Sequence, residues 1–229
     1  MSDFQLSVLC LVVTLVLYFA NKRLYRRFHK LPLMPLVFTP ILLVLILVFG
    51  HISYQNYMGE THWLLWLLGP ATIAFAVPVY DNLAIIKRHW MSLTAGVTTA
   101  VVVAVTSSVW LARLLTLPDA IQRSLAVRSI TTPFALAAAK PIGGQPALVA
   151  LFVVITGVFG MAVGDALFML LAIRAGMAKG AGFGAASHGA GTARSYELGP
   201  QEGVVASLVM MLSGVVMVLA APLVRLLMF

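Results

Sequence analysis

Long apolar runs alternate with short polar connections along the whole chain. A helix that crosses the hydrocarbon core of a bilayer needs roughly 20 mostly apolar residues. Six runs approach or exceed this length, at residues 4–20, 33–50, 63–80, 91–111, 146–173 and 203–227. The pattern therefore predicts an all-α, polytopic integral membrane protein with six transmembrane helices.

Two prolines interrupt the third of these runs. Pro70 and Pro78 each lack a backbone N–H and leave the carbonyl four residues earlier without its helical donor. Two structures are compatible with this spacing: a kinked helix that packs against its neighbours, or a broken helix that contributes to a site.

Composition supports the membrane assignment. Apolar residues make up 61% of the 229 residues and charged residues 10%, whereas an ordinary soluble domain has about 25% charged residues. A soluble domain of this size has too little interior to bury so much apolar surface. The net charge of +8 does not indicate nucleic acid, because the Lys and Arg residues lie between the apolar runs and not in one basic stripe. The single cysteine, Cys10, excludes an intrachain disulfide and a cysteine metal cluster.

The basic residues predict the topology. Lys and Arg concentrate in short cytoplasmic connections of membrane proteins. The densest basic run, 22–30, is therefore expected inside and the N-terminus outside. Lys87 with Arg88, and Arg174 with Lys179, are expected inside for the same reason. Six spans then place both termini outside.

Two further segments, 126–145 and 180–200, fit neither a lipid-facing span nor a solvated loop. They contain too many Gly, Pro and polar residues for a lipid-facing span. They contain too many apolar and small residues for a solvated loop. Irregular backbone at membrane depth is tolerated where it is buried in protein or lines a cavity. One segment is predicted to enter from outside and the other from inside, as broken or re-entrant elements, and such a pair is typical of an inverted-repeat transporter with a midplane site. The alternatives are two ordinary loops with miscounted spans, or two crossing segments that raise the count to eight.

The side chains of these two segments suit a small carboxylate. Small residues expose backbone N–H groups at the start of a half-helix, where the helix dipole favours an anion. Arg194 offers a guanidinium that matches a carboxylate in a bidentate way, or it is an anchor at the cytoplasmic interface. The predicted substrate-binding residues are Thr131, Thr132, Pro133, Gly143, Gly144, Ser187, His188, Gly191, Thr192 and Arg194. No cofactor and no metal ion is implied.

Ionisable groups at membrane depth are usually functional. Asp165, His188, Glu197 and Glu202 are therefore candidates for proton coupling. The alternative is that these groups pair with Arg194 or Lys140 and stabilise the structure. The chain lacks a Gly-x-Ser-x-Gly elbow, a His-Glu-x-x-His pair and a P-loop, so we expect that it is not an enzyme.

Three motifs in order resemble the LrgB/CidB family of multi-pass bacterial membrane proteins. They are Arg128–Pro133, Ile142–Pro146, and Ser187–Ala193 followed by Glu197. The resemblance extends from Leu68 to the last predicted helix. The family commonly has Pro-Lys before the first serine, where this chain has Val-Arg at 127–128.

The resemblance implies a location in the bacterial cytoplasmic (inner) membrane and two competing functions. In one, the protein acts with a small LrgA/CidA-type membrane subunit as a holin- or antiholin-like regulator of murein hydrolase activity and autolysis. In the other, it moves small monocarboxylates such as glycolate, glycerate or pyruvate. The residues favour transport of the glycolate, glycerate, pyruvate or lactate class, with lysis control as the alternative. A structural subunit without a substrate is a third reading, and homo-oligomerisation is compatible with all three.

We predict one transmembrane domain, 1–229, in which residues 1–62 form a two-helix scaffold and residues 63–229 the transport core.

Overall fold

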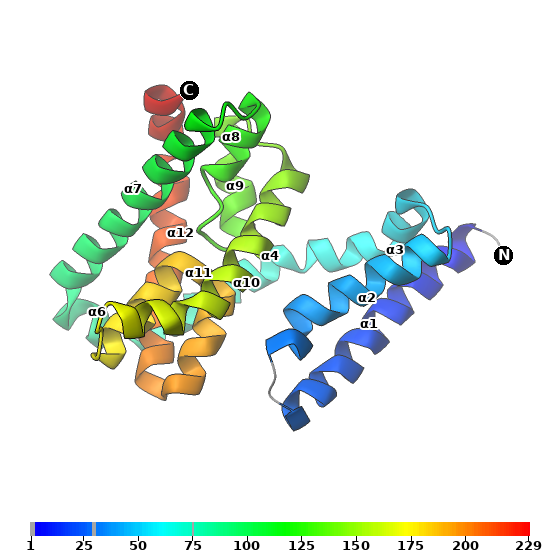
Figure 1. Cartoon of the computed structure of the whole chain (residues 1–229), viewed down its shortest axis with the longest axis horizontal. Helices are drawn as coiled ribbons and strands as arrows, with labels where there is room; N and C mark the ends of the chain where they lie inside the picture. Colours follow the sequence, from blue (N-terminus) through cyan, green and yellow to red (C-terminus); the bar gives the residue numbers. More distant parts are fainter. Residues whose placement is uncertain (1–2, 29–30, 75) are drawn as a thin grey trace. The chain divides into compact units, whose positions relative to one another are not determined.

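The computed structural model describes residues 3–28, 31–74 and 76–229, and every regular element in these ranges is a helix (Figure 1). This confirms the all-α prediction. His29 and Lys30 of the predicted basic run, and Phe75 of the third predicted span, lie outside the described residues. The chain divides into two compact units, unit 1 (residues 1–71) and unit 2 (residues 72–229).

Unit 1 contains α1 (Asp3–Phe28), the 3-10 helix η1 (Leu31–Leu33), α2 (Pro35–Phe49) and α3 (Tyr54–Trp66). Polar contacts join these helices. The Asn21 amide donates to Thr39 Oγ1 at 3.1 Å between α1 and α2, and Ser7 Oγ donates to the Asn56 carbonyl at 2.7 Å between α1 and α3. In a bilayer, where lipid is as apolar as the helix surfaces, such hydrogen bonds and close packing hold helices together.

Four helices of the described residues are long and apolar enough to cross a membrane: α1, α7 (Trp90–Leu114), α10 (Pro146–Leu170) and α12 (Pro200–Met228). They coincide with four of the six predicted spans. The predicted span at 33–50 forms α2, whose 15 residues extend about 22 Å and fall short of the roughly 30 Å hydrocarbon core.

The predicted span at 63–80 differs more from its expectation. In place of one helix the structure has the end of α3, then α4 (Leu68–Ala74) and α5 (Ala76–Asp81), with α6 (Leu83–Arg88) following. Proline removes a backbone donor and clashes with the preceding turn, and one proline lies in each of α4 and α5. Phe75 between α4 and α5 lies outside the described residues, so the choice between a kinked helix and a broken helix stays a prediction.

Unit 2 is built on the three long helices α7, α10 and α12. Two shorter helices, α8 (Asp119–Leu125) and α9 (Thr132–Ile142), lie in the chain between α7 and α10. A fourth helix, α11 (Gly176–Leu198), lies between α10 and α12. Figure 1 shows α8 beside the C-terminal end of α12 and α11 beside its other half. Each connection between long helices thus carries an inserted helical element.

The apolar core of unit 2 joins α7, α9, α10 and α12. Val109, Ile142, Val153 and Met217 belong to one buried cluster and are each at most 1% exposed. Large apolar side chains on the outer faces, such as Phe159, remain exposed, as expected for helices that face lipid. This core fixes α9 and α10 against each other and so positions the segment that precedes α9.

Candidate functional site

The chain from α8 to α9 forms a helical hairpin, which we call the α8–α9 hairpin (residues 119–142). Two hydrogen bonds join the C-terminal end of α8 to the C-terminal end of α9. Arg123 Nη1 donates to the carbonyl of Ile142 at 2.8 Å, and the Gln145 N–H donates to Ser124 Oγ at 3.0 Å. The connecting residues 126–131 therefore run from these bonds toward the start of α9, and their second half, residues 128–131, forms the tip. Thr131 lies about the length of α9 away from the bonds, or roughly 16 Å.

The tip leads directly into the first turn of α9. Thr131 is extended (φ −63°, ψ 148°) and α9 begins at Thr132, with Pro133 in its first turn, where a missing N–H costs nothing. The Thr131 side chain does not cap the helix. Its buried hydroxyl has no hydrogen-bond partner among the described residues, and neither has the buried hydroxyl of Ser213 on α12.

Arg128 lies in the same tip. Its Nε donates to Ser108 Oγ on α7 at 2.9 Å and its Nη1 to Thr156 Oγ1 on α10 at 3.4 Å. Both partners are neutral hydroxyls. Among the described residues, no carboxylate lies within ion-pair distance of this half-buried guanidinium. A cation inside a membrane bundle without an acidic partner is a strong candidate for a functional group.

The second inserted element, α11, is also a hairpin. His188 interrupts it with φ 38° and ψ −121°, a conformation that non-glycine residues rarely adopt. Gly176 at the start of α11 packs against the carboxylate of Glu202, which lies in the first turn of α12 and so close to the end of α11. The two ends of α11 are therefore together, and His188 is the tip of what we call the α11 hairpin (residues 176–198).

The two tips meet the same part of α10. The His188 ring forms a hydrogen bond through Nε2 with the Val153 carbonyl at 2.9 Å, one turn of α10 away from Thr156, to which Arg128 donates. A Cβ on Gly157 would lie 2.6 Å from His188 Cε1. The absence of a side chain at Gly157 is therefore what allows the α11 tip to reach the middle of α10.

The two hairpins enter unit 2 from opposite ends. α7 ends and α10 begins beside the base of the α8–α9 hairpin, and α10 ends where the α11 hairpin starts. A long helix followed by a hairpin thus occurs twice, in opposite directions, and both tips point to the centre.

The sequence of this chain matches one family over nearly its full length. Residues 14–227 match the LrgB-like family. The chain belongs to the LrgB-like family. With four helices long and apolar enough to span, it is a multi-pass membrane protein.

Curated relatives cover most of this LrgB-like chain. YwbG of Bacillus subtilis (strain 168) is 32% identical over 217 residues, which are 95% of this chain and 96% of the relative. YxaC of the same organism is 34% identical over 194 residues, which are 85% of this chain and 84% of the relative. The holin-like protein CidB of Staphylococcus epidermidis is 27% identical over 229 residues, which are 100% of both chains. No solved structure matches the chain.

The structure brings only part of the predicted substrate-binding set of this LrgB-like chain to the tips. Thr131, Thr132 and Pro133 lie at one tip, and Ser187 with His188 at the other. Gly143 and Gly144 lie elsewhere, at the far end of α9. Gly143 ends α9 in the left-handed region (φ 86°), which favours glycine. A Cβ added at this position would lie 3.5 Å from Arg123 Cδ, an ordinary contact distance. The turn therefore explains the glycine.

Gly191 and Thr192 lie in the second arm of the α11 hairpin. Both are buried. A Cβ on Gly191 would lie 2.7 Å from Ser187 Cβ in the first arm, and Thr192 Oγ1 contacts Met210 Sδ of α12 at 3.6 Å. These two residues hold the hairpin together and against α12.

Arg194 is engaged in two ion pairs. Its Nη2 lies 2.8 Å from Asp165 Oδ2 on α10, and its Nη1 lies 2.6 Å from Glu197 Oε2 on α11. Two carboxylates therefore already neutralise this guanidinium, and it lies away from the tips. The sequence left open whether Arg194 binds a substrate carboxylate, anchors the chain at the interface or pairs with an acidic residue. The geometry matches the last of these, an ion pair between α10 and α11.

The four predicted proton-coupling residues are likewise separated. Asp165 and Glu197 belong to the Arg194 ion pairs, and Glu202 packs at the base of the α11 hairpin. Only His188 lies at a tip. Asp165 is about 12 Å along α10 from Gly157, so a direct proton transfer between Asp165 and His188 does not fit this arrangement.

Sequence reasoning did not select Arg128 as a site residue. A signal was present, because Arg128 is the one charged residue of the apolar and small-residue segment 126–139, and such a charge at membrane depth marks a site. Among the described residues no group of three or more His, Cys, Asp or Glu is placed to hold a metal ion.

Proposed function

We propose that this chain is a secondary transporter of small monocarboxylates, of the glycolate, glycerate, pyruvate or lactate class. The observation that carries this proposal is Arg128, a half-buried guanidinium at a hairpin tip whose hydrogen-bond partners are hydroxyls. A single carboxylate supplies the charge that this site lacks. The neutral partners orient the guanidinium without neutralising it.

The start of α9 complements this cation. Thr131 offers a buried hydroxyl without a partner among the described residues, and an unpaired buried hydroxyl costs about 1–3 kcal/mol. The first N–H groups of α9 and the positive end of its dipole also favour an anion. A small hydroxy or keto acid has one carboxylate for Arg128 and one neighbouring oxygen for Thr131, which is the basis of the substrate class.

Two hairpins that meet at the middle of α10 support alternating access. Movement of one hairpin opens the site to one side while the other stays closed. His188 is the proposed proton-coupling residue, because it alone of the four candidates lies at a tip. A histidine changes charge in the physiological pH range.

Uptake into proteoliposomes tests the transport function. The purified chain is reconstituted and supplied with labelled glycolate, glycerate, pyruvate and lactate, with and without an inward proton gradient. We expect saturable flux that Arg128→Gln abolishes and Arg128→Lys reduces at least tenfold in kcat/KM, since lysine lacks the bidentate fork. Arg174→Gln, at an exposed position outside the hairpins, is the matched control and should leave flux unchanged. Lack of flux for all four acids, also with an LrgA/CidA-type subunit present, would overturn the proposal.

A second candidate is holin-like control of murein hydrolase activity and autolysis with an LrgA/CidA-type membrane partner. The names of the staphylococcal relatives, which are holin-like proteins, favour it over transport, whereas the hairpin geometry does not require it. The same vesicles distinguish the two functions, because a holin-like hole releases an entrapped neutral dye and a carrier does not. Release of dye that is insensitive to Arg128→Gln would favour this second function.

A further inference from the structure

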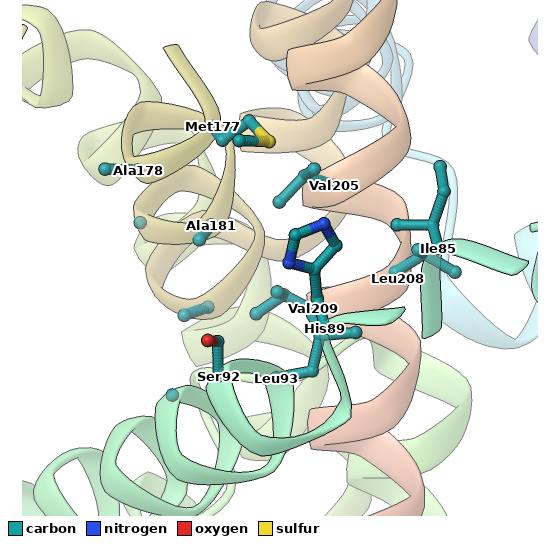
Figure 2. A pocket seen from close by; sticks show the side chains of 13 residues that line it. Ile85, His89, Ser92, Leu93, Met177, Ala178, Ala181, Val205, Leu208 and Val209 are labelled. Atoms are coloured by element: carbon teal, nitrogen blue, oxygen red, sulfur yellow. The ribbon is translucent and has the colours of Figure 1, made fainter. Parts of the chain in front are cut away.

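An apolar groove of about 430 Å³ lies in unit 2 between the start of α7, the first arm of the α11 hairpin and α12 (Figure 2). Figure 2 shows the His89 ring projecting into it, with Ser92 as the neighbouring polar side chain. The rest of the lining is apolar and includes Leu93, Ala181, Ala185, Val205, Leu208 and Val209. None of the residues of the proposed substrate site lines this groove.

The groove lies where a membrane-spanning helix begins. α7 starts at Trp90, directly after His89, and the exposed Trp90 side chain is typical of the membrane–water interface. From there the lining follows α7 inward to Gly96, nearly two turns into the span. One end of the groove is therefore at headgroup level and its apolar walls lie beside the hydrocarbon.

Basic residues lie next to the lining residues in the chain. Lys87 and Arg88 lie between the lining residues Ile85 and His89, are exposed, and form no ion pair with any residue that the structure describes. Lys179 lies between two lining positions of α11. On the predicted topology the headgroup end of the groove faces the cytoplasm, where the leaflet surface is anionic.

We propose that this groove binds one anionic phospholipid. One acyl chain occupies the apolar groove, and the phosphate lies at the mouth, near Lys87, Arg88 and the His89 ring. An apolar cavity of this size beside the hydrocarbon matches a lipid chain. The exposed basic residues that adjoin Ile85 and His89 in the chain match a net negative headgroup in charge. A zwitterionic lipid leaves these cations without full compensation.

Native mass spectrometry of the full chain tests this site. The protein is purified in detergent, equilibrated with dioleoyl-phosphatidylglycerol or dioleoyl-phosphatidylcholine, and the lipids retained per chain are counted. We expect one phosphatidylglycerol to persist under conditions that strip phosphatidylcholine. Equal retention of the two lipids would overturn the proposal.

A variant that fills the groove tests where the acyl chain binds. Gly96→Leu fills the groove, because a Cβ at Gly96 has no atom within 4 Å, and it should reduce phosphatidylglycerol retention at least fivefold. Its neighbour Ala95, exposed and outside the lining, gives the matched control Ala95→Leu, which should retain the lipid. Full retention in Gly96→Leu, or a change in its oligomeric mass in place of lipid loss, would overturn the proposal.

The charge requirement is tested separately with exposed residues whose replacement leaves the packing intact. Lys87→Gln with Arg88→Gln should lower retention of phosphatidylglycerol roughly tenfold and leave phosphatidylcholine unaffected. The matched control is Arg26→Gln with Arg27→Gln, an exposed basic pair of unit 1. Equal losses in the two double variants would show a general charge effect and contradict the site.

Discussion

Arg128 and Arg194 are two arginines of unit 2 in opposite electrostatic surroundings. Arg194 contacts the carboxylates of Asp165 and Glu197, whereas Arg128 contacts the hydroxyls of Ser108 and Thr156. A charge that is taken out of water without a counter-charge destabilises the fold, and a paired charge does so much less. At the residue scale, Arg128 therefore has the environment of a binding group and Arg194 that of a structural one.

Replacement by methionine should separate these two roles. Arg128→Met removes an unpaired cation and is expected to raise the midpoint of thermal unfolding in detergent while it abolishes transport. Arg194→Met leaves Asp165 and Glu197 without their cation and is expected to lower the free energy of unfolding by about 1 kcal/mol, because the pairs are partly exposed. Thermal melts and uptake on the same samples check both expectations, and a stabilised Arg194→Met would contradict the structural role.

The backbone at His188 gives a second prediction at this scale. With φ 38°, this residue is strained by on the order of 1–3 kcal/mol, and its ring bonds the Val153 carbonyl. His188→Ala keeps the strain and removes the bond, whereas His188→Gly removes both. We expect the glycine variant to be more stable than the alanine variant by roughly 1 kcal/mol. Thermal unfolding of both variants measures the difference, and equal midpoints would show that the tip is not held in this conformation.

At the scale of elements, α10 is the common support of both hairpins. Its N-terminal half packs with α9 in the apolar core. Its middle and second half carry Gly157, Gly160 and Gly164, against which the α11 hairpin packs. Close approach along this face places the Ser187–His188 tip at the same turn of α10 that Arg128 reaches.

A side chain at Gly160 should separate the α11 hairpin from α10. A Cβ there would overlap Ser187 Oγ, so Gly160→Val forces the hairpin to move, and overpacking of this kind costs about 1–3 kcal/mol. Ala162→Val, exposed on the same helix, is the matched control and should be close to neutral. Thermal unfolding and proteoliposome flux measure the effect. If both variants behave alike, the contact between α10 and the hairpin is not a determinant of the fold.

At the scale of the whole molecule, the opposed hairpins of unit 2 require that their bases face opposite sides of the membrane. The Cys10→Ala background removes the single native thiol. In it, Gln145→Cys and Arg174→Cys introduce exposed thiols at the two ends of α10. A membrane-impermeant maleimide applied to intact cells should label Gln145→Cys and reach Arg174→Cys only after permeabilisation. Labelling of both positions from one side would contradict the opposed arrangement.

The sequence predicted much of the fold because lipid imposes strong local constraints. Apolar length identified α1, α7, α10 and α12, and the glycine and proline content of 126–145 and 180–200 identified the segments that form the two hairpins. Both signals are local. The shortness of α2 was not predicted, because apolar composition shows which residues lipid tolerates and not where a helix starts and ends. Pro70 and Pro78 left a kinked and a broken helix open at 63–80.

The tertiary structure decided which of two arginines, among the residues that it describes, lies without a carboxylate partner. Arg128 and Arg194 look alike in sequence, each beside small and polar residues, and the carboxyl partner of Arg194 on α10 is 29 positions away. The i, i+3 pair of Arg194 with Glu197 is local, whereas its pair with Asp165 forms only because the α11 hairpin packs against α10. Only the packing of the α8–α9 hairpin between α7 and α10 gives Arg128 hydroxyl partners. The sequence by itself therefore determined a helical membrane protein with two broken segments. The contacts between distant helices determined which arginine of those segments, among the described residues, has hydroxyl partners and no carboxylate partner.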